Sequence, residues 1–239
     1  MLQLQSLKVS TSSIEDYLNW REHANLKAPY FITIKTDFEE LPMSGFRDSQ
    51  LVFIQKMNQY VWNFKPKSYA RDGFVVKFST DEDITKILRV GSKAFQFSRF
   101  HSDKRFSPQL AEKIKSQWLL SNLTSRENCE TLVLLDENGE VVGFSSILHY
   151  TDRLVIDLIA ITPEFRGKGL GRLLVYHSQA LSFKKNLPLT VGTQNKNTAN
   201  ALYRSMDFKL VNSSCVWHDI RWDSTSSSSL TESTRLIDS

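Results

Sequence analysis

The segment from residue 154 to residue 181 constrains the fold more than any other part of this chain. Leu154–Ile161 has the composition of a strand, glycines follow at positions 167, 169 and 171, and a helical pattern of apolar residues begins at once. Such a loop turns backbone N–H groups toward one point at a helix N-terminus, where the helix dipole favours an anion. Glycine also lets the backbone approach a phosphate closely. Basic side chains add charge of the right sign: Arg166, Lys168 and Arg172.

The remaining pattern predicts an α/β fold with a partly antiparallel sheet and helices on its faces. Strands are expected at residues 74–78, 131–135, 141–148, 154–161, 187–191 and 208–217. Helices are expected from Asp81, from Pro108, directly after the glycine loop and over 197–206. The expected order is therefore β-α-α-β-β-β-α-β-α-β.

The spacing of the glycines distinguishes between classes of phosphate-binding loop. A Walker A loop needs G-x-x-x-x-G-K-[ST] and a dinucleotide loop needs G-x-G-x-x-G, whereas the spacing here is G-x-G-x-G. The run Arg166-x-x-Gly169-x-Gly171 instead resembles the pyrophosphate loop of the GNAT acetyltransferase superfamily. Ile159–Ile161 and Pro163, which precede the run, fit the same family pattern.

A second segment carries the same resemblance, which extends from about Phe74 to Trp217. Residues 197–208 read N-T-A-N-A-L-Y-R-S-M-D-F and are similar to the family's N-x-x-A-x-x-x-Y-x-x-x-G-F. Neither Asn195 nor Asn197 stands at the usual distance before Tyr203. Asp207 replaces the usual glycine, so the turn there is expected to be reshaped.

The resemblance implies a GNAT acyltransferase fold over residues 70–222, a mixed and mostly antiparallel sheet flanked by helices. Residues 1–69 have strand-like runs at 30–35 and 51–56, and predict a small N-terminal α+β domain that binds the acceptor or forms a homodimer. Residues 223–239 are serine-rich and too poor in apolar side chains to fold.

The resemblance also implies acetyl-coenzyme A as co-substrate. Backbone amides of the loop would hold its diphosphate, and the pantetheine arm would pair like an added strand with the end of the preceding strand. The positions expected to bind this cofactor are Ile159, Ala160, Ile161, Arg166, Gly167, Lys168, Gly169, Leu170, Gly171 and Asn197.

Two residues are candidates for proton transfer. Tyr203 matches the tyrosine that protonates the leaving thiolate in many relatives, and the acid role is favoured over the alternative of a tyrosine packed on the core. Asp157 could accept the proton of the incoming ammonium group or serve as a structural hydrogen-bonder. By period two it is expected to share a face with Ile159 and Ile161. Some relatives place a catalytic acid two residues earlier, where this chain has Val155.

The segment 95–106, together with Gln117–Trp118, resembles the bacterial TDP-fucosamine acetyltransferases, which acetylate the 4-amino group of a nucleotide-linked deoxysugar. The residues expected to bind such an acceptor are Arg99, Phe100 and Phe106, by stacking and by contact with a diphosphate. The alternative for this segment is a hydrophobic helix end with solvated charges. Other amines remain open as acceptors, namely a peptide, a polyamine or an antibiotic, and so does a non-catalytic acyl-coenzyme A-binding module.

Composition limits the partners. The formal net charge of +4 and the pI near 9.0 suit an anionic small ligand, and no dense basic block predicts nucleic-acid binding. The five histidines have no metal-ligand spacing, so no metal is expected. No signal peptide and no membrane-spanning run is recognised, which predicts a cytoplasmic protein.

Overall fold

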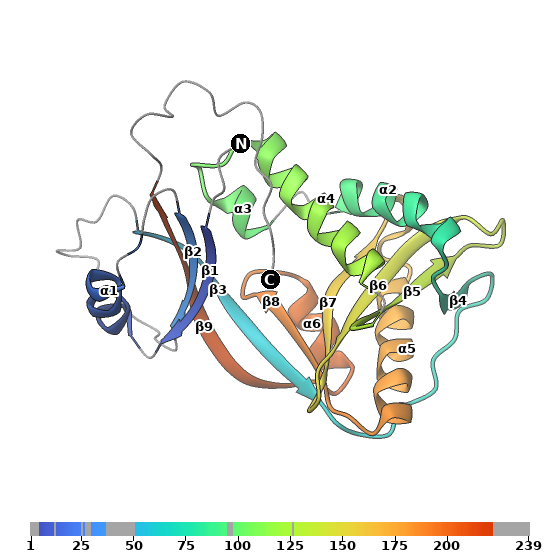
Figure 1. The fold of residues 1–239 in the computed structure, drawn as a ribbon. Coiled ribbons are helices and arrows are strands. Elements are labelled where there is room, and N and C mark those ends of the chain that lie inside the picture. Colours follow the sequence, from blue (N-terminus) through green and yellow to red (C-terminus); the bar gives the residue numbers. More distant parts are fainter. Residues whose placement is uncertain are drawn as a thin grey trace. The chain divides into compact units, whose positions relative to one another are not determined.

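The computed structural model describes residues 5–11, 13–24, 26, 30–36, 51–94, 98–125 and 127–221 (Figure 1). The chain forms two compact units, one made of residues 1–57 and 212–239 and the other of residues 58–211. These limits differ from the predicted division between residues 69 and 70. The predicted serine-rich tail, 223–239, lies outside the described residues.

The first unit contains β1 (Gln5–Thr11), α1 (Ile14–His23) and β2 (Tyr30–Thr36), of which only β2 was predicted. β1 is parallel to β2, and β2 is antiparallel to the end of β9 (Lys209–Arg221). The helix is fixed to β9 by Asp219, whose Oδ2 accepts hydrogen bonds from Tyr17 at 2.7 Å and Arg21 at 2.9 Å. Burial and this carboxylate raise the pKa of Tyr17 well above its usual range.

The second unit is built on a sheet whose strand order is β9-β3-β8-β7-β6-β5-β4. β3 (Leu51–Trp62) and β9 each begin or end in the first unit and contribute their other end here. The neighbours β4 to β7 are antiparallel, and β7 is parallel to β8. The remaining strands are β4 (Val75–Phe78), β5 (Cys129–Leu135), β6 (Val141–His149), β7 (Leu154–Ile161) and β8 (Leu189–Gln194).

Helices cover both faces of this sheet (Figure 1). On one face α2 (Ile84–Ala94), which follows a 3₁₀ turn at Asp81–Asp83, and α4 (Pro108–Thr124) bury apolar residues against β5 to β7. On the other face lie α5 (Leu170–Lys185) and α6 (Ala199–Ser205). A short α3 (Arg99–Ser102) and a 3₁₀ turn (Pro163–Phe165) complete the described elements. The predicted α/β class and the order of strands and helices after residue 73 are confirmed, apart from the unpredicted α3.

A β-bulge interrupts β7 at Asp157. Ser146 of β6 pairs with Leu158, and Ile147 pairs with Ile156, so Asp157 has no partner on β6. One extra residue at this point places two successive side chains on the same side of the sheet.

The bulge reverses which residues of β7 face each helix layer. Buried residues before it pack with α5, and buried residues after it pack with α2 and α4. Asp157 faces α4, where its carboxylate accepts hydrogen bonds, whereas Ile159 and Ile161 pack on the α5 side. The expectation that these three share a face is therefore wrong, because simple alternation does not continue across a bulge.

Candidate active site

The glycine-rich loop joins β7 to α5, and two of its glycines adopt the left-handed conformation. Gly167 has a φ of 77° and Gly169 a φ of 79°. Gly169 is also the N-cap of α5, so the first N–H groups of this 16-residue helix open from the loop. Gly171 faces α6, where a Cβ would make an ordinary contact of 3.5 Å with Leu202 Cδ2. The loop therefore presents N–H donors at the positive end of a helix dipole.

Three basic residues predicted at this loop lie close to it. Arg166 Nε donates to the carbonyl oxygen of Ile161 at 3.1 Å, and Lys168 Nζ lies 4.7 Å from the centre of the Phe165 ring. Arg172 lies in the first turn of α5. None of the three cations forms an ion pair within the part of the chain that the structure describes; the neighbouring Glu164 pairs with Lys93 instead.

β7 and β8 separate after three paired residues. Their parallel register ends at Ile156 and Val191, although β7 continues to Ile161 and β8 to Gln194. On its other edge β7 stays paired with β6 up to Ile161. Residues 157–161 therefore present a backbone edge that no neighbouring strand occupies in the described sheet, and an extended ligand can pair with such an edge.

α6 places Tyr203 in the core between two aromatic rings. The side chain is only 2% exposed, and its ring centre lies 6.0 Å from that of Tyr60 and 5.5 Å from that of Phe208. Burial raises the pKa of Tyr203 well above its usual range. The hydroxyl therefore stays protonated at neutral pH, as that of an ordinary tyrosine does.

Asn200, which sequence reasoning missed, anchors the start of α6. Its Nδ2 donates to the carbonyl oxygens of Gln194 and Asn197, and its Oδ1 accepts from Asn58 and Tyr60, both at 2.9 Å. The predicted cofactor ligand Asn197 uses its Oδ1 to cap the helix, through Ala199 N at 2.9 Å, and its Nδ2 to bind Gln194 at 3.1 Å. Its side chain therefore has a local role at the helix start.

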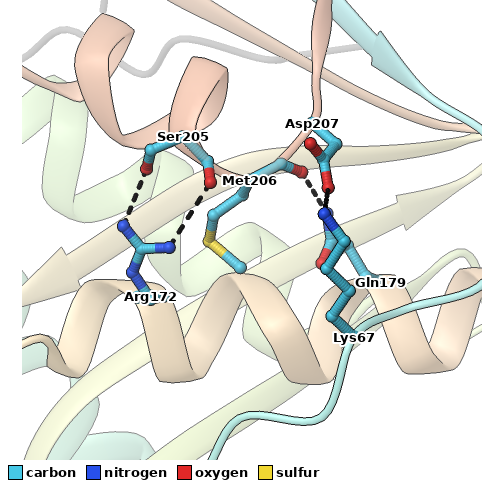
Figure 2. Close-up of polar contacts among 6 residues, drawn as sticks. All are labelled: Lys67, Arg172, Gln179, Ser205, Met206 and Asp207. Carbon is cyan, nitrogen blue, oxygen red and sulfur yellow. Dashed lines mark hydrogen bonds and ion pairs between the residues drawn. The ribbon is translucent and has the colours of Figure 1, made fainter.

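Figure 2 shows how α6 and the turn after it are fastened to α5. Arg172 donates to Ser205 Oγ at 2.9 Å and to its carbonyl oxygen at 3.4 Å, and Gln179 donates to the carbonyl oxygen of Met206 at 2.9 Å. Asp207 forms an ion pair with Lys67 at 2.7 Å. These contacts join α6 and the turn after it to α5 and to the stretch before β4.

The turn at Asp207 keeps the conformation that glycine would give it. Asp207 has a φ of 63°, in the left-handed region, which aspartate tolerates better than most residues. The expected reshaping of this turn is therefore not observed.

Asp157 is held by two side chains of α4. Its Oδ2 accepts from Trp118 Nε1 at 2.8 Å and from Asn122 Nδ2 at 2.7 Å. The two donors are four residues apart and so lie on the same face of the helix. The bulge and these two donors fix the position of the carboxylate.

Lys115 is a further residue that sequence reasoning missed. It is 8% exposed, and its Nζ lies 4.0 Å from the centre of the Trp118 ring. Burial lowers the pKa of Lys115 to about 8, Asp157 acts in the opposite direction, and Arg99 lowers it further. The spacing 115–118–122 on one helix face was the available signal, since it gathers a lysine, an indole and an amide toward β7.

Arg99 links the aromatic residues predicted to bind the acceptor to Trp118. The guanidinium carbon of Arg99 lies 4.8 Å from the centre of the Phe100 ring and 5.3 Å from that of Trp118. Phe100 is buried and packs edge-on against Phe106, with ring centres 5.7 Å apart. Through Trp118 this cluster is continuous with Asp157.

The described residues contain neither a metal-binding cluster nor a membrane-spanning helix. No group of three or more His, Cys, Asp or Glu side chains in the described ranges could hold a metal ion. No helix in those ranges is both long and apolar enough to cross a membrane.

Comparison with known proteins agrees with this geometry. Residues 97–208 match the acetyltransferase (GNAT) family. The spore coat polysaccharide biosynthesis protein SpsD of Bacillus subtilis is 30% identical over 138 residues, which are 57% of this chain and 47% of SpsD. The chain thus spans about half the length of this curated relative.

Two solved structures share the fold at low sequence identity. A functionally unknown conserved protein from Staphylococcus epidermidis gives a TM-score of 0.64 at 16% identity, over 89% of this chain and 83% of the other. The GCN5-related N-acetyltransferase from Sphaerobacter thermophilus gives 0.57 at 13% identity, over 86% of this chain and 65% of the other. Over residues 97–208, somewhat less than half of its length, this chain is thus similar to the acetyltransferase (GNAT) family.

Proposed function

We propose that this chain transfers an acetyl group from acetyl-coenzyme A to a primary amine by direct attack in a ternary complex. The observation that carries the proposal is the separation of β7 from β8 directly beside the left-handed glycine loop. This arrangement offers both an edge for an extended amide-containing arm and a set of N–H donors for a diphosphate.

The residues present fit coenzyme A. The positive end of α5 and three cations without ion-pair partners in the described chain suit a diphosphate. Backbone groups of Ile159 to Ile161 would pair with the pantetheine arm, and residues 166–171 would hold the diphosphate. When bound, this co-substrate supplies an acyl group activated as a thioester.

Tyr203 is proposed to protonate the sulfur of the leaving group. Its buried hydroxyl remains protonated at neutral pH, and α6 is fixed to α5 by Arg172 and Ser205. A phenol held in this way can donate a proton within hydrogen-bond reach.

Asp157 is proposed to receive the proton of the acceptor's ammonium group. Trp118 and Asn122 both donate to its Oδ2, which orients the carboxylate from the α4 side. Lys115 lies in the same cluster. Because its pKa is lowered to about 8, the charge of this cluster changes near neutral pH.

For the acceptor we propose a nucleotide-linked amino-deoxysugar of the TDP-4-amino-4,6-dideoxyhexose type, used in making a cell-surface polysaccharide. Arg99 and the aromatic pair Phe100–Phe106 would bind the nucleotide portion. The cation Lys115 interacts with both the carboxylate of Asp157 and a second cation, Arg99, and this positive charge disfavours a polycationic acceptor such as a polyamine. The related protein SpsD is named for spore coat polysaccharide biosynthesis.

The test is an acetylation assay with acetyl-coenzyme A and a panel of acceptors: TDP- and UDP-linked 4-amino and 3-amino sugars, a peptide with a free N-terminus, and spermidine. We expect turnover with a nucleotide-linked amino sugar and none with spermidine. Turnover of the peptide or of spermidine alone would refute the sugar acceptor, and the absence of any turnover despite coenzyme A binding would favour a non-catalytic binding module.

A further inference from the structure

Two residues upstream of the family-matched segment lie at the glycine loop. Tyr69 and Arg71 belong to the stretch between β3 and β4. A Cβ built on Gly169 would lie 2.6 Å from Tyr69 Oη and 2.7 Å from Arg71 Nη2. Tyr69 Oη also donates to the carbonyl oxygen of Gly169 at 3.4 Å. This stretch therefore crosses the N-terminus of α5 directly beside the residue that caps it.

The ring of Tyr69 holds two guanidinium groups. The central guanidinium carbon of Arg71 lies 5.3 Å from the ring centre and that of Arg172 lies 5.8 Å from it. Arg172 is also fixed by Ser205, as Figure 2 shows. Stacking on an aromatic ring orients a guanidinium while leaving its N–H groups free to bind an anion.

The charge distribution around these groups is unbalanced. Four cations, Arg71, Arg166, Lys168 and Arg172, lie around the positive end of α5, and none has an ion-pair partner in the described ranges. A cation at a helix N-terminus is repelled by the helix dipole, and neighbouring cations repel one another. A doubly charged anion at this point would relieve both repulsions.

We infer that Arg71, oriented by the Tyr69 ring, binds the diphosphate of acetyl-coenzyme A together with the glycine loop. The inference rests on the proposed function and extends the cofactor site to a stretch outside residues 97–208. Arg71 supplies two N–H groups in a fixed plane, which match two phosphate oxygens, whereas the loop supplies backbone N–H groups.

The inference is tested by calorimetric titration of coenzyme A into the full chain and its variants. Removing one charge-assisted contact from this exposed site raises the Kd by roughly 5- to 20-fold, so this increase is expected for Arg71→Ala. Arg71→Lys should recover part of the loss, because a lysine keeps the charge without the planar pair of donors. Tyr69→Ala should also weaken binding, whereas Tyr69→Phe, which keeps the ring, should bind within about two-fold of the unmodified protein.

The matched control is Lys184→Ala, which removes the same charge from the last turn of α5. It should change the Kd by less than about two-fold, because surface charges more than a Debye length apart are screened. An equal effect of Arg71→Ala and Lys184→Ala would overturn the inference.

Dephospho-coenzyme A, which keeps the diphosphate but lacks the 3′-phosphate, locates the contact. Arg71→Ala should weaken it by the same factor as coenzyme A. A loss confined to coenzyme A would assign Arg71 to the 3′-phosphate and refute the diphosphate contact. Failure of the unmodified chain to bind either compound would instead contradict the proposed function itself.

Discussion

The indole Nε1 of Trp118 donates a hydrogen bond to Asp157 Oδ2 over 2.8 Å, from the middle of α4 to the bulge of β7. Trp118→Phe keeps an aromatic ring and removes this donor. We expect the free energy of unfolding to fall by about 1–2 kcal/mol, as for other hydrogen bonds to charged groups that are partly exposed. A double-mutant cycle with Asp157→Ala, measured by urea unfolding, should give a coupling near that value. A coupling of zero would show that the contact contributes nothing to stability.

The proposed role of Asp157 predicts a pH-dependent defect. Asp157→Asn keeps an oxygen for the two donors on α4 and removes the group that accepts a proton. Turnover at pH 7 should fall by about ten-fold or more, and it should recover as the pH approaches the pKa of the acceptor amine, since the amine then loses its proton to solvent. A pH–rate profile of both proteins measures this, and parallel profiles would assign Asp157 a structural role.

Tyr203→Phe should lower kcat without changing coenzyme A binding. The hydroxyl has no hydrogen bond to any described residue, so its removal should leave stability nearly unchanged, while a general acid contributes roughly 100-fold or more to a rate. The control is Tyr176→Phe on α5. If kcat were the same for Tyr203→Phe and the unmodified enzyme, the hydroxyl would have no part in proton transfer.

Gly169→Ala should weaken coenzyme A binding beyond its effect on stability. Alanine at a φ of 79° destabilises the fold by about 1 kcal/mol, and its Cβ would displace Tyr69 and Arg71. Gly139→Ala is the matched control, because Gly139 has a φ of 76° but no atom within 4 Å of its Cβ position. Thermal unfolding should show similar losses for both variants, and calorimetry should show weaker binding only for Gly169→Ala. Gly169→Asp should abolish binding, since it adds like charge.

The lowered pKa of Lys115 predicts that the free energy of unfolding rises with pH. Its pKa is about 8 in the folded chain and near 10.5 in the unfolded chain, so between these values the unfolded state binds more protons. The free energy of unfolding of the unmodified protein should therefore increase, relative to Lys115→Met, by on the order of 2 kcal/mol from pH 7 to pH 10. Urea unfolding at both pH values measures the difference. A constant difference would mean that Lys115 keeps its ordinary pKa.

The strand–loop–helix unit could be predicted because its signals are local. Three glycines, a preceding apolar strand and a following helical pattern lie within one segment, and Gly167 and Gly169 indeed adopt positive φ. The bulge at Asp157 has no such signal, because the sequence does not mark which residue of a strand lacks a partner on the neighbouring strand. The side chain consequently faces α4 and not the side of Ile159 and Ile161.

Contacts between segments that are far apart in the sequence also could not be predicted from the local pattern of residues. Tyr69 and Arg71 are close to Gly169 only because the stretch before β4 crosses α5. Lys115 reads as a solvated helix residue, yet the packing of α4 on the sheet buries it. The role of Asn200, one helical turn before Tyr203, depends on Asn58 and Tyr60 of β3.

β3 runs without interruption through Leu51–Trp62 as a neighbour of β8, and two of its residues, Asn58 and Tyr60, bind Asn200. A truncated chain starting at residue 70 would leave one side of β8 bare, with a row of unpaired amides and carbonyls open to other molecules. It would also lose the anchor of the helix that carries Tyr203. A shortened chain that preserves the segment matched by the family must therefore also retain the residues from 58 onward.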